Sequence, residues 1–296
     1  MTPSRSEPIA LGALLLGAVA IGSSAIWVRL SETGPVATAL WRVALAVPFL
    51  SLWALLERQP ADRRPKANRR GLLAAGGFFA GDLAFWHLSI MLTTVAAATL
   101  LANLAPIFVT LAGWLWLSER VTGKFVLALV VALTGVALLI SADFGAGAAA
   151  LWGDALGLVT ALFYAAYLLQ IKRLRSELST AHIMAWSSLL TAILLLPVAL
   201  LLGEQTVPAT AAGWAVVLGL ALVSQVGGQS LIAYGLAHLP ASLGSVSLLV
   251  QPVCATVFAW LLLGESIGPA QIAGGCLALV GIRMAHRAAA PTEARP

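Results

Sequence analysis

The chain of 296 residues contains ten apolar runs, and each is about as long as a helix that crosses a membrane. About 20 mostly apolar residues are needed to span roughly 30 Å of hydrocarbon. The runs therefore predict an all-α integral membrane fold with ten transmembrane helices. Their ranges are 9–30, 36–56, 71–92, 95–117, 124–141, 153–173, 181–202, 214–238, 242–263 and 270–287.

The composition supports a membrane location. Hydrophobic residues make up 60% of the chain and charged residues only 10%, whereas a water-soluble domain carries about 25% charged residues. Lipid must therefore be most of the solvent of this chain. The first run follows Arg5 as in a signal peptide, but it is longer than the usual apolar core of 7–15 residues. We interpret it as a retained first span.

The distribution of basic residues predicts the orientation. Short loops rich in Lys and Arg face the cytoplasm. With the N-terminus inside, all 17 Lys and Arg except Arg29 and Arg42 fall on the cytoplasmic side. One span more or fewer would invert every later loop and destroy this partition. We expect a multi-pass protein of the inner (plasma) membrane with both termini cytoplasmic, and the basic segment 58–70 then needs no nucleic-acid partner.

The sequence also contains an internal repeat. At a constant offset of 146, residues of the first half match residues of the second half. The clearest pairs are Pro106 with Pro252, Trp114 with Trp260, Glu119 with Glu265, and Gly135 with Gly281. Earlier in the chain, Trp41 matches Trp186 at an offset of 145. The repeat predicts two five-helix units, 1–145 and 146–296.

A repeat of five spans has a consequence for topology. Because five is odd, the second unit must enter the bilayer from the opposite side. Inverted repeats of this kind are typical of carriers that work by alternating access, with the substrate site near the midplane between the two units. The repeat therefore favours a transporter.

Several segments resemble one known family. They include IGSSAIWVRL, ALWRVALAVP, LAPIFVTLAGWLWLSERVTG and GLAHLPASLGSVSLLVQPVCATVFAWLLLGE. Over approximately residues 9–287 the chain resembles the drug/metabolite transporter superfamily, and within it the EamA-type carriers. The resemblance implies export of metabolites such as amino acids. Family members often carry an acid just before the proline of the ninth span, where this chain has Gln251.

Asp82 is the first candidate for the substrate site, because a charge at membrane depth costs roughly 2.5–3.5 kcal/mol and so points to function. On a helix it shares a face with Phe78, Trp86 and Ser89. Asp82 can bind a substrate ammonium or carry a proton, and the alternative is an acid satisfied by a neighbouring helix. His87 points away from this face, and the structural interpretation is a bond to a carbonyl.

Other polar residues leave two interpretations open. Arg42 can bind a substrate carboxylate or snorkel to the outer interface. Gln225 and Gln229 are four residues apart, so they can orient a zwitterion together or form interhelical hydrogen bonds.

Positions of helix bending complete the candidate site. Asn103 and Gln251 precede Pro106 and Pro252, where a proline frees a backbone carbonyl that can bind a ligand or simply makes a gating kink. Gly22 lets helices approach closely or bend. Tyr164 lies near mid-span and can stack on a flat or cationic substrate.

The sequence contains no GxSxG, HExxH or CxxC motif and no paired intramembrane acids, so we expect neither an enzyme nor a cofactor or metal. The favoured function is an exporter of small metabolites, above all aromatic or neutral amphipathic amino acids. The first alternative is a proton-coupled exporter of organic cations or drugs that uses Asp82. A channel or a lipid-handling scaffold is the alternative from a different class. The expected partners are a small-molecule substrate, the lipid bilayer and protons as a candidate coupling ion, with a monomer or a dimer both open.

Overall fold

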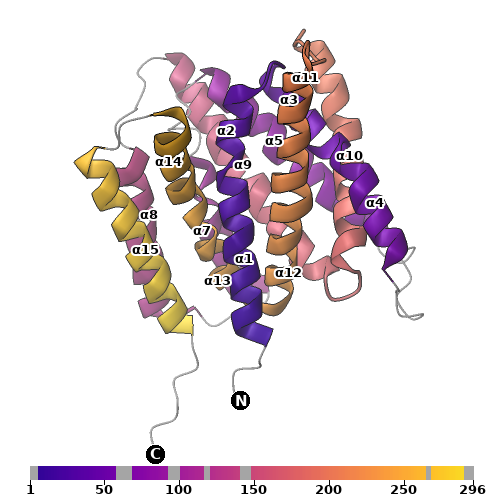
Figure 1. Ribbon diagram of the computed structural model, residues 1–296. Coiled ribbons are helices and arrows are strands. Elements are labelled where there is room, and N and C mark those ends of the chain that lie inside the picture. The colour runs from indigo at the N-terminus through magenta and orange to yellow at the C-terminus, as the bar shows by residue number, and fades with distance from the viewer. Residues whose placement is uncertain are drawn as a thin grey trace, which may run out of the picture.

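The computed structural model describes residues 6–57, 69–92, 101–116, 121–140, 148–264 and 268–289, and all regular structure within them is helical (Figure 1). The first half contains α1 (Ser6–Gly22), α2 (Ser24–Leu30), α3 (Pro35–Ala44), α4 (Ala46–Leu56), α5 (Arg69–Leu92), α7 (Ala105–Trp116) and α8 (Gly123–Ile140). The second half contains α9 (Ala148–Leu174), α10 (Thr180–Leu201), α11 (Ala211–Leu220), the π-helix η3 (Ala221–Gln229), α12 (Ser230–His238), α13 (Ala241–Ser247), α14 (Val250–Leu263) and α15 (Pro269–Ala289).

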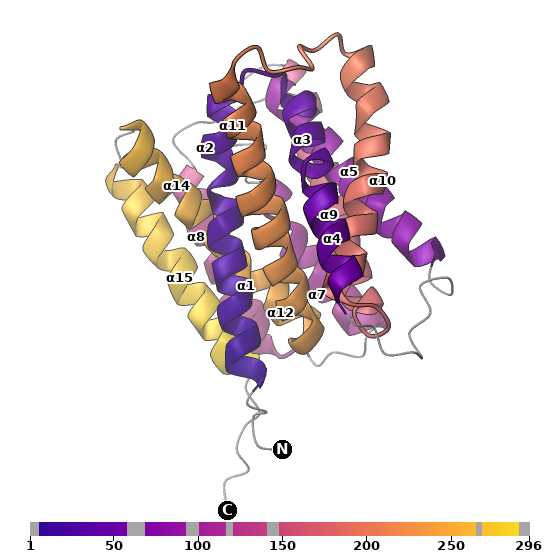
Figure 2. The same cartoon turned by 45° about the vertical axis from the view of Figure 1, so that its right-hand side comes forward.

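The helices form one upright bundle. The start of α1 and the end of α15 lie at the same face, and α2, α3 and α11 meet near the opposite face (Figures 1 and 2). Among the described residues, seven continuous or broken helices are long and apolar enough to cross a membrane. The predicted fourth, fifth and tenth spans contain α7, α8 and α15, which are shorter or carry charges at one end. A multi-pass membrane fold is thus supported, and the count of ten crossings stays a prediction.

Large apolar side chains cover the outside of the bundle. Leu201 is 87% exposed, Leu55 83% and Trp116 79%. A water-soluble protein rarely exposes apolar patches of this extent. These side chains therefore suit contact with lipid, as the composition predicts.

Most of the predicted spans that carry site residues are broken into two helices. Span 1 breaks at Ser23 and span 2 at Leu45. The two prolines of the repeat both lie in the first turn of a helix. Pro106 is the second residue of α7, and Pro252 is the third residue of α14. A proline fits the first turn of a helix because the N–H it lacks would be unpaired there. Each proline therefore begins a new helix after a break instead of bending a continuous one.

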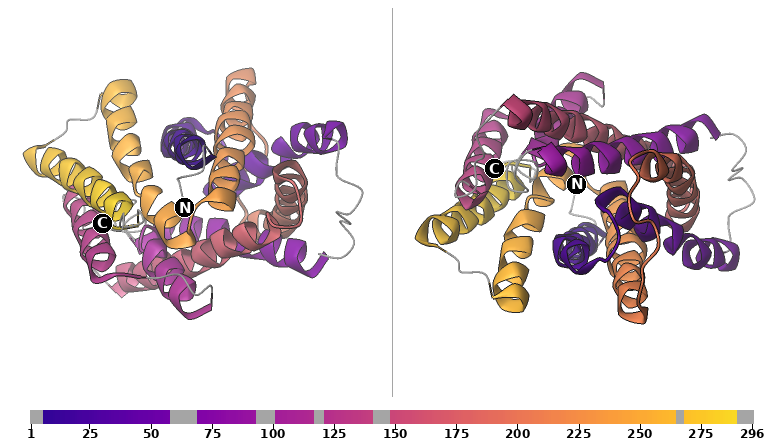
Figure 3. Two further views of the ribbon diagram at one scale, coloured as in Figure 1. Left: turned by 90° about the horizontal axis from the view of Figure 1, so that it is seen from below. Right: turned by 90° about the horizontal axis from the view of Figure 1, so that it is seen from above.

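The packing partly repeats between the two halves. Helix α8 packs along α15, its repeat-related partner, at one end of the bundle (Figure 3). A Cβ atom on Gly135 would overlap the backbone of Ala278, and one on Gly281 would overlap the backbone of Ala132. The two glycines of the sequence repeat thus let the two backbones approach closely.

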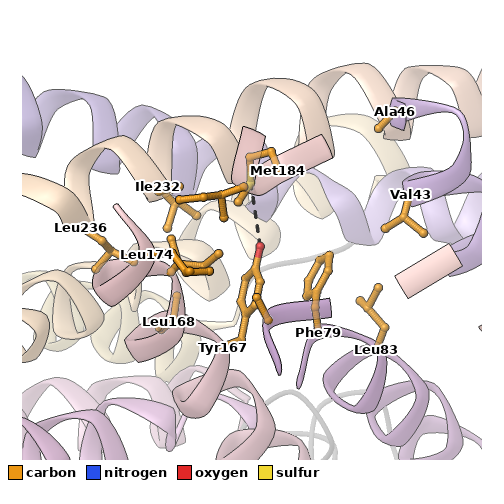
Figure 4. Packing of buried hydrophobic residues seen from close by; sticks show 14 of the residues in the cluster. Val43, Ala46, Phe79, Leu83, Tyr167, Leu168, Leu174, Met184, Ile232 and Leu236 are labelled. Atoms are coloured by element: carbon orange, nitrogen blue, oxygen red, sulfur yellow. Dashed lines mark hydrogen bonds between the residues drawn. The ribbon is translucent and has the colours of Figure 1, made fainter. Parts of the chain in front are cut away.

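The buried core joins the two halves. The ring of Phe79 from α5 stacks on that of Tyr167 from α9, with centroids 4.5 Å apart and planes inclined by 15° (Figure 4). The Tyr167 hydroxyl points to the sulfur of Met184 on α10, 3.9 Å away. Because these residues come from both repeats, neither repeat has a separate core here.

Candidate functional site

Two opposite charges are buried inside the bundle. Arg42 on α3 and Asp82 on α5 are each only 9% exposed, and they interact electrostatically. Within the described ranges, no hydrogen bond or ion pair joins the two side chains. Burying charge is costly unless it is paired and hydrogen-bonded. Their separate placement therefore leaves both groups available to a polar ligand.

Arg42 is held in place by a polar chain across three helices. Its Nε donates a 3.2 Å hydrogen bond to the amide oxygen of Gln225. The amide nitrogen of Gln225 donates to the hydroxyl of Ser188 on α10 at 3.0 Å. Gln225 and Ser188 are fully buried. Of the two interpretations of Arg42, its burial and these hydrogen bonds favour the one in which the side chain points into the bundle.

Gln225 lies at the centre of the π-helix η3. A π-helix has i→i+5 hydrogen bonds, is rare, and is frequently found at functional sites. Gln229 is buried as well, at 3% exposure, but only Gln225 reaches Arg42. Gln225 thus forms the interhelical hydrogen bonds of the second interpretation, and joint binding of a zwitterion by Gln225 and Gln229 stays a prediction.

Aromatic rings surround the two charges. The guanidinium carbon of Arg42 lies 5.9 Å from the ring centre of Phe79. Tyr164, on α9, interacts electrostatically with both Arg42 and Asp82, and its hydroxyl accepts a 3.4 Å hydrogen bond from the amide of Gln251. The structure thus brings Tyr164 and Gln251 to the same region as the charged pair.

Other rings of α5 pack against α9. Phe163 contacts Phe78 with ring centres 6.3 Å apart and Phe85 with ring centres 5.2 Å apart. The face of α5 that carries Asp82 is therefore shared between two regions. One lies beside the buried charges, and the other packs against Phe163 of α9.

Two residues of α5 serve packing. The hydroxyl of Ser89 is fully buried and donates to the carbonyl of Gly153 on α9 at 2.7 Å. The Nδ1 of His87 lies 2.6 Å from the carbonyl of Leu83, one turn earlier. The imidazole meets the ring of Trp86 edge-on at 4.9 Å, and its Nε2 is buried without a hydrogen-bond partner. His87 thus bonds a carbonyl as expected, and Ser89 fastens α5 to α9 instead of facing a substrate.

The remaining predicted residues lie at helix breaks and contacts. A Cβ atom on Gly22 would lie 2.8 Å from the carbonyl oxygen of Gln251 and from the Cβ of Cys254. Gly22 is therefore a close-approach point between α1 and α14. Asn103 is half-buried in the turn that precedes α7.

Ser188 and Phe79 are the site residues that sequence reasoning missed. Ser187 and Ser188 form a polar pair inside an otherwise apolar run, which is the pattern that could have indicated a buried hydrogen bond. Phe79 lies in the stretch AAGGFFAG (residues 74–81), where nothing in the sequence distinguishes it from its neighbour Phe78. The described residues contain no group of three His, Cys, Asp or Glu side chains that could hold a metal ion.

An apolar helical bundle that buries a hydrogen-bonded arginine and an aspartate has features expected of a membrane transporter. The comparisons with known proteins agree. The EamA-like transporter family matches two segments, residues 8–141 and 151–286. The chain belongs to this family, which confirms the resemblance seen in the sequence.

Three curated relatives are each 28% identical to this chain. An uncharacterized transporter of Archaeoglobus fulgidus matches over 93% of this chain and 95% of its own length. The pseudopaline exporter CntI of Pseudomonas aeruginosa matches over 76% and 78%. A probable terminal-alkyne amino-acid exporter of Streptantibioticus cattleyicolor matches over 94% and 93%. A crystal structure with 19% identity has a TM-score of 0.81 and covers 98% of this chain, which shows that the fold is shared.

Proposed function

We propose that this protein exports amino acids, or metabolites built on an amino-acid zwitterion, across the inner membrane. The observation that carries the proposal is the buried pair of Arg42 and Asp82, which interact without a hydrogen bond between them. A zwitterion offers a carboxylate to the guanidinium and an ammonium to the aspartate. Both buried charges are then paired by one ligand.

The role of each group follows from its chemistry. Arg42 keeps its NH₂ groups for the substrate because its Nε is already bonded to Gln225, and two N–H groups of a guanidinium can bind a carboxylate in a fork. Asp82 accepts from the ammonium. The rings of Phe79 and Tyr164 favour a substrate with an aromatic or amphipathic side chain. Two relatives are named exporters, and the name of one of them specifies an amino acid. These names support the proposal of amino-acid export.

The inverted repeat supports alternating access at this site. In that mechanism the occupied site opens in turn to each side of the membrane. The measurement is counterflow in proteoliposomes: unlabelled amino acid inside should accelerate uptake of labelled amino acid from outside. A channel or a lipid-handling scaffold would give no such trans-stimulation.

Arg42→Gln should abolish counterflow, whereas Arg42→Lys should retain part of it, because a lysine keeps the charge and loses the fork. Equal counterflow by wild type and Arg42→Gln would refute the role of Arg42.

A proton-coupled exporter of organic cations is the second candidate, and the buried Asp82 favours it. In that case Asp82 exchanges a proton for the cation, and a pH gradient drives transport. Asp82→Asn should then remove the response to the gradient while a cation still exchanges down its own gradient. An amino-acid flux with the same pH dependence in Asp82→Asn and wild type would exclude this coupling.

A further inference from the structure

On the face opposite the termini, a carboxylate of the second half caps a helix of the first half. Glu204 lies between α10 and α11. Its carboxylate accepts the N–H of Val36 at 3.2 Å and that of Ala37 at 2.7 Å. Helix α3 cannot supply this cap itself, because its N-cap residue, Gly34, has no side chain and Pro35 has no N–H. Glu204 therefore takes the place of the missing N-cap.

A carboxylate of the first half makes the reciprocal contact. Glu32 lies between α2 and α3 and accepts the N–H groups of Ala209 at 2.9 Å and of Thr210 at 3.0 Å, together with the hydroxyl of Thr210. The same hydroxyl oxygen caps α11 by accepting the N–H of Gly213 at 3.0 Å. Each half thus holds the start of a helix that belongs to the other half. We call these two contacts the crossed caps.

Both crossed caps rest on a glycine. A Cβ atom on Gly34 would overlap the side chain of Glu204, and one on Gly213 would overlap that of Glu32. Neither carboxylate could take its present place against a larger residue. Each crossed cap therefore requires a glycine at the position that its carboxylate contacts.

The capped segments are continuous with the helices that carry the site. Arg42 lies seven residues beyond Pro35, about 10 Å along α3. Helix α11 runs directly into η3, which carries Gln225. The segment from α10 to α11 passes over the face at which α3 begins (Figure 2), and the indole of Trp41 donates to the carbonyl of Thr206 at 2.6 Å. Movement of α3 away from α11 at this face requires that the crossed caps separate.

We propose that Glu32 and Glu204 form the external gate of this transporter: the crossed caps keep α3 and α11 together while the site is closed to the outside, and their release opens it. The proposal rests on the proposed transport function. Helix N-termini suit a gate at an aqueous face, because water can take over the released N–H donors. The positive end of each helix dipole then draws the carboxylates back.

The first test measures access to the site without needing a substrate. Ser188→Cys, in a chain with Cys254→Ala and Cys276→Ala, reports access when a membrane-impermeant thiol reagent is added outside. Glu32→Gln and Glu204→Gln should each speed labelling about fivefold, and the double variant more. Gly34→Ala and Gly213→Ala should act in the same direction by displacing the carboxylates. Glu7→Gln, an equal change of charge on an exposed residue at the other face, is the control and should leave labelling unchanged.

Unchanged labelling in the double Glu variant and in both alanine variants would overturn the proposal. A second test leaves the crossed caps intact, so it does not depend on variants that fold poorly. A cleavable cross-linker between Pro35→Cys and Gln205→Cys should lock the gate, stop counterflow and allow recovery on cleavage. Counterflow that continues in the cross-linked protein contradicts the gate. If the gate variants label faster but no amino acid shows counterflow, the gate stands and the proposed substrate is wrong.

Discussion

The Nε of Arg42 donates a 3.2 Å hydrogen bond to the amide oxygen of Gln225, a residue 183 positions later in the chain. This bond ties α3 in the first half to the π-helix η3 in the second. Ser188 on α10 extends it by fixing the amide of Gln225. The orientation of the arginine therefore depends on two helices of the opposite half, so a relative movement of the halves acts directly on the group that we assign to the substrate carboxylate.

Gln225→Leu should weaken substrate binding. The change leaves the Nε of Arg42 buried without an acceptor, which costs about 1–3 kcal/mol and corresponds to about 5- to 150-fold in affinity. We expect the loss in KM more than in the maximal rate of counterflow. Gln229→Leu, in the same helix and equally buried, should have a smaller effect. An equal effect of the two changes would contradict the positioning role of Gln225.

The buried charges should show thermodynamic coupling. Arg42→Gln or Asp82→Asn alone removes the electrostatic attraction that partly offsets the cost of burying the remaining charge. The double variant removes both charges and should be less destabilised than the sum of the single changes, by more than about 0.5 kcal/mol. Thermal unfolding in detergent measures the three variants. Additive effects would show that the two groups do not interact.

The sequence predicts the helices well because apolar runs and loop charges act locally. It also predicts where the helices break near Pro106 and Pro252, since a proline restricts its own backbone. The inward direction of Arg42 could not be predicted, because the span is apolar around most of its circumference and no face is marked. The caps by Glu32 and Glu204 join residues more than 160 positions apart, and the only local hint is the Gly34–Pro35 helix start that lacks its own cap.

The π-helix illustrates a different limit. The spacing of Gln225 and Gln229 predicts an α-helix, whereas the structure has a π-helix over Ala221–Gln229. The i→i+5 hydrogen bonding of η3 occurs where the segment packs against α1, α3 and α4, and no local pattern in 221–229 reveals it.

The contact between α8 and α15 should not tolerate a methyl group at its crossing. Gly135→Ala places a Cβ against the backbone of Ala278, where neither chain can yield without moving a helix. Gly77→Ala is the matched control, since its Cβ would meet no atom within 4 Å and an alanine favours a helix by about 0.5–1 kcal/mol. The melting temperature should therefore fall for Gly135→Ala and stay the same or rise for Gly77→Ala. Similar melting temperatures for the two variants would contradict this packing.

The cap formed by Glu32 should weaken in acid. The Thr210 hydroxyl, followed by the N–H groups of Thr210 and Ala209, lowers the pKa of Glu32 below its ordinary value of 4.5. A carboxyl with a lower pKa in the capped state contributes fully above its released-state value, and the contribution is lost as the pH falls through the capped-state value. External pH values that fall below 4.5, the ordinary pKa of this carboxyl, should therefore speed labelling of Ser188→Cys relative to a free thiol labelled at the same pH, a reference that corrects for the loss of reactive thiolate in acid.

Glu204 is a second carboxylate at this face, so the pH dependence is measured in a Glu204→Gln background. Glu32→Gln in that background should remove the acid response, because no ionisable group then remains in the caps. A response that persists in this double variant must come from other groups and would contradict the assignment to Glu32.

Recognition of a zwitterion by Arg42 and Asp82 is tested most directly by competition in counterflow. Phenylalanine is compared with phenethylamine, which lacks the carboxylate, and with 3-phenylpropionate, which lacks the ammonium. Only the amino acid pairs both buried charges, so it alone should compete strongly. Arg42→Gln should abolish the advantage of the amino acid over the amine. Equal competition by phenethylamine and phenylalanine in the wild-type protein would contradict the zwitterion site and favour the export of organic cations.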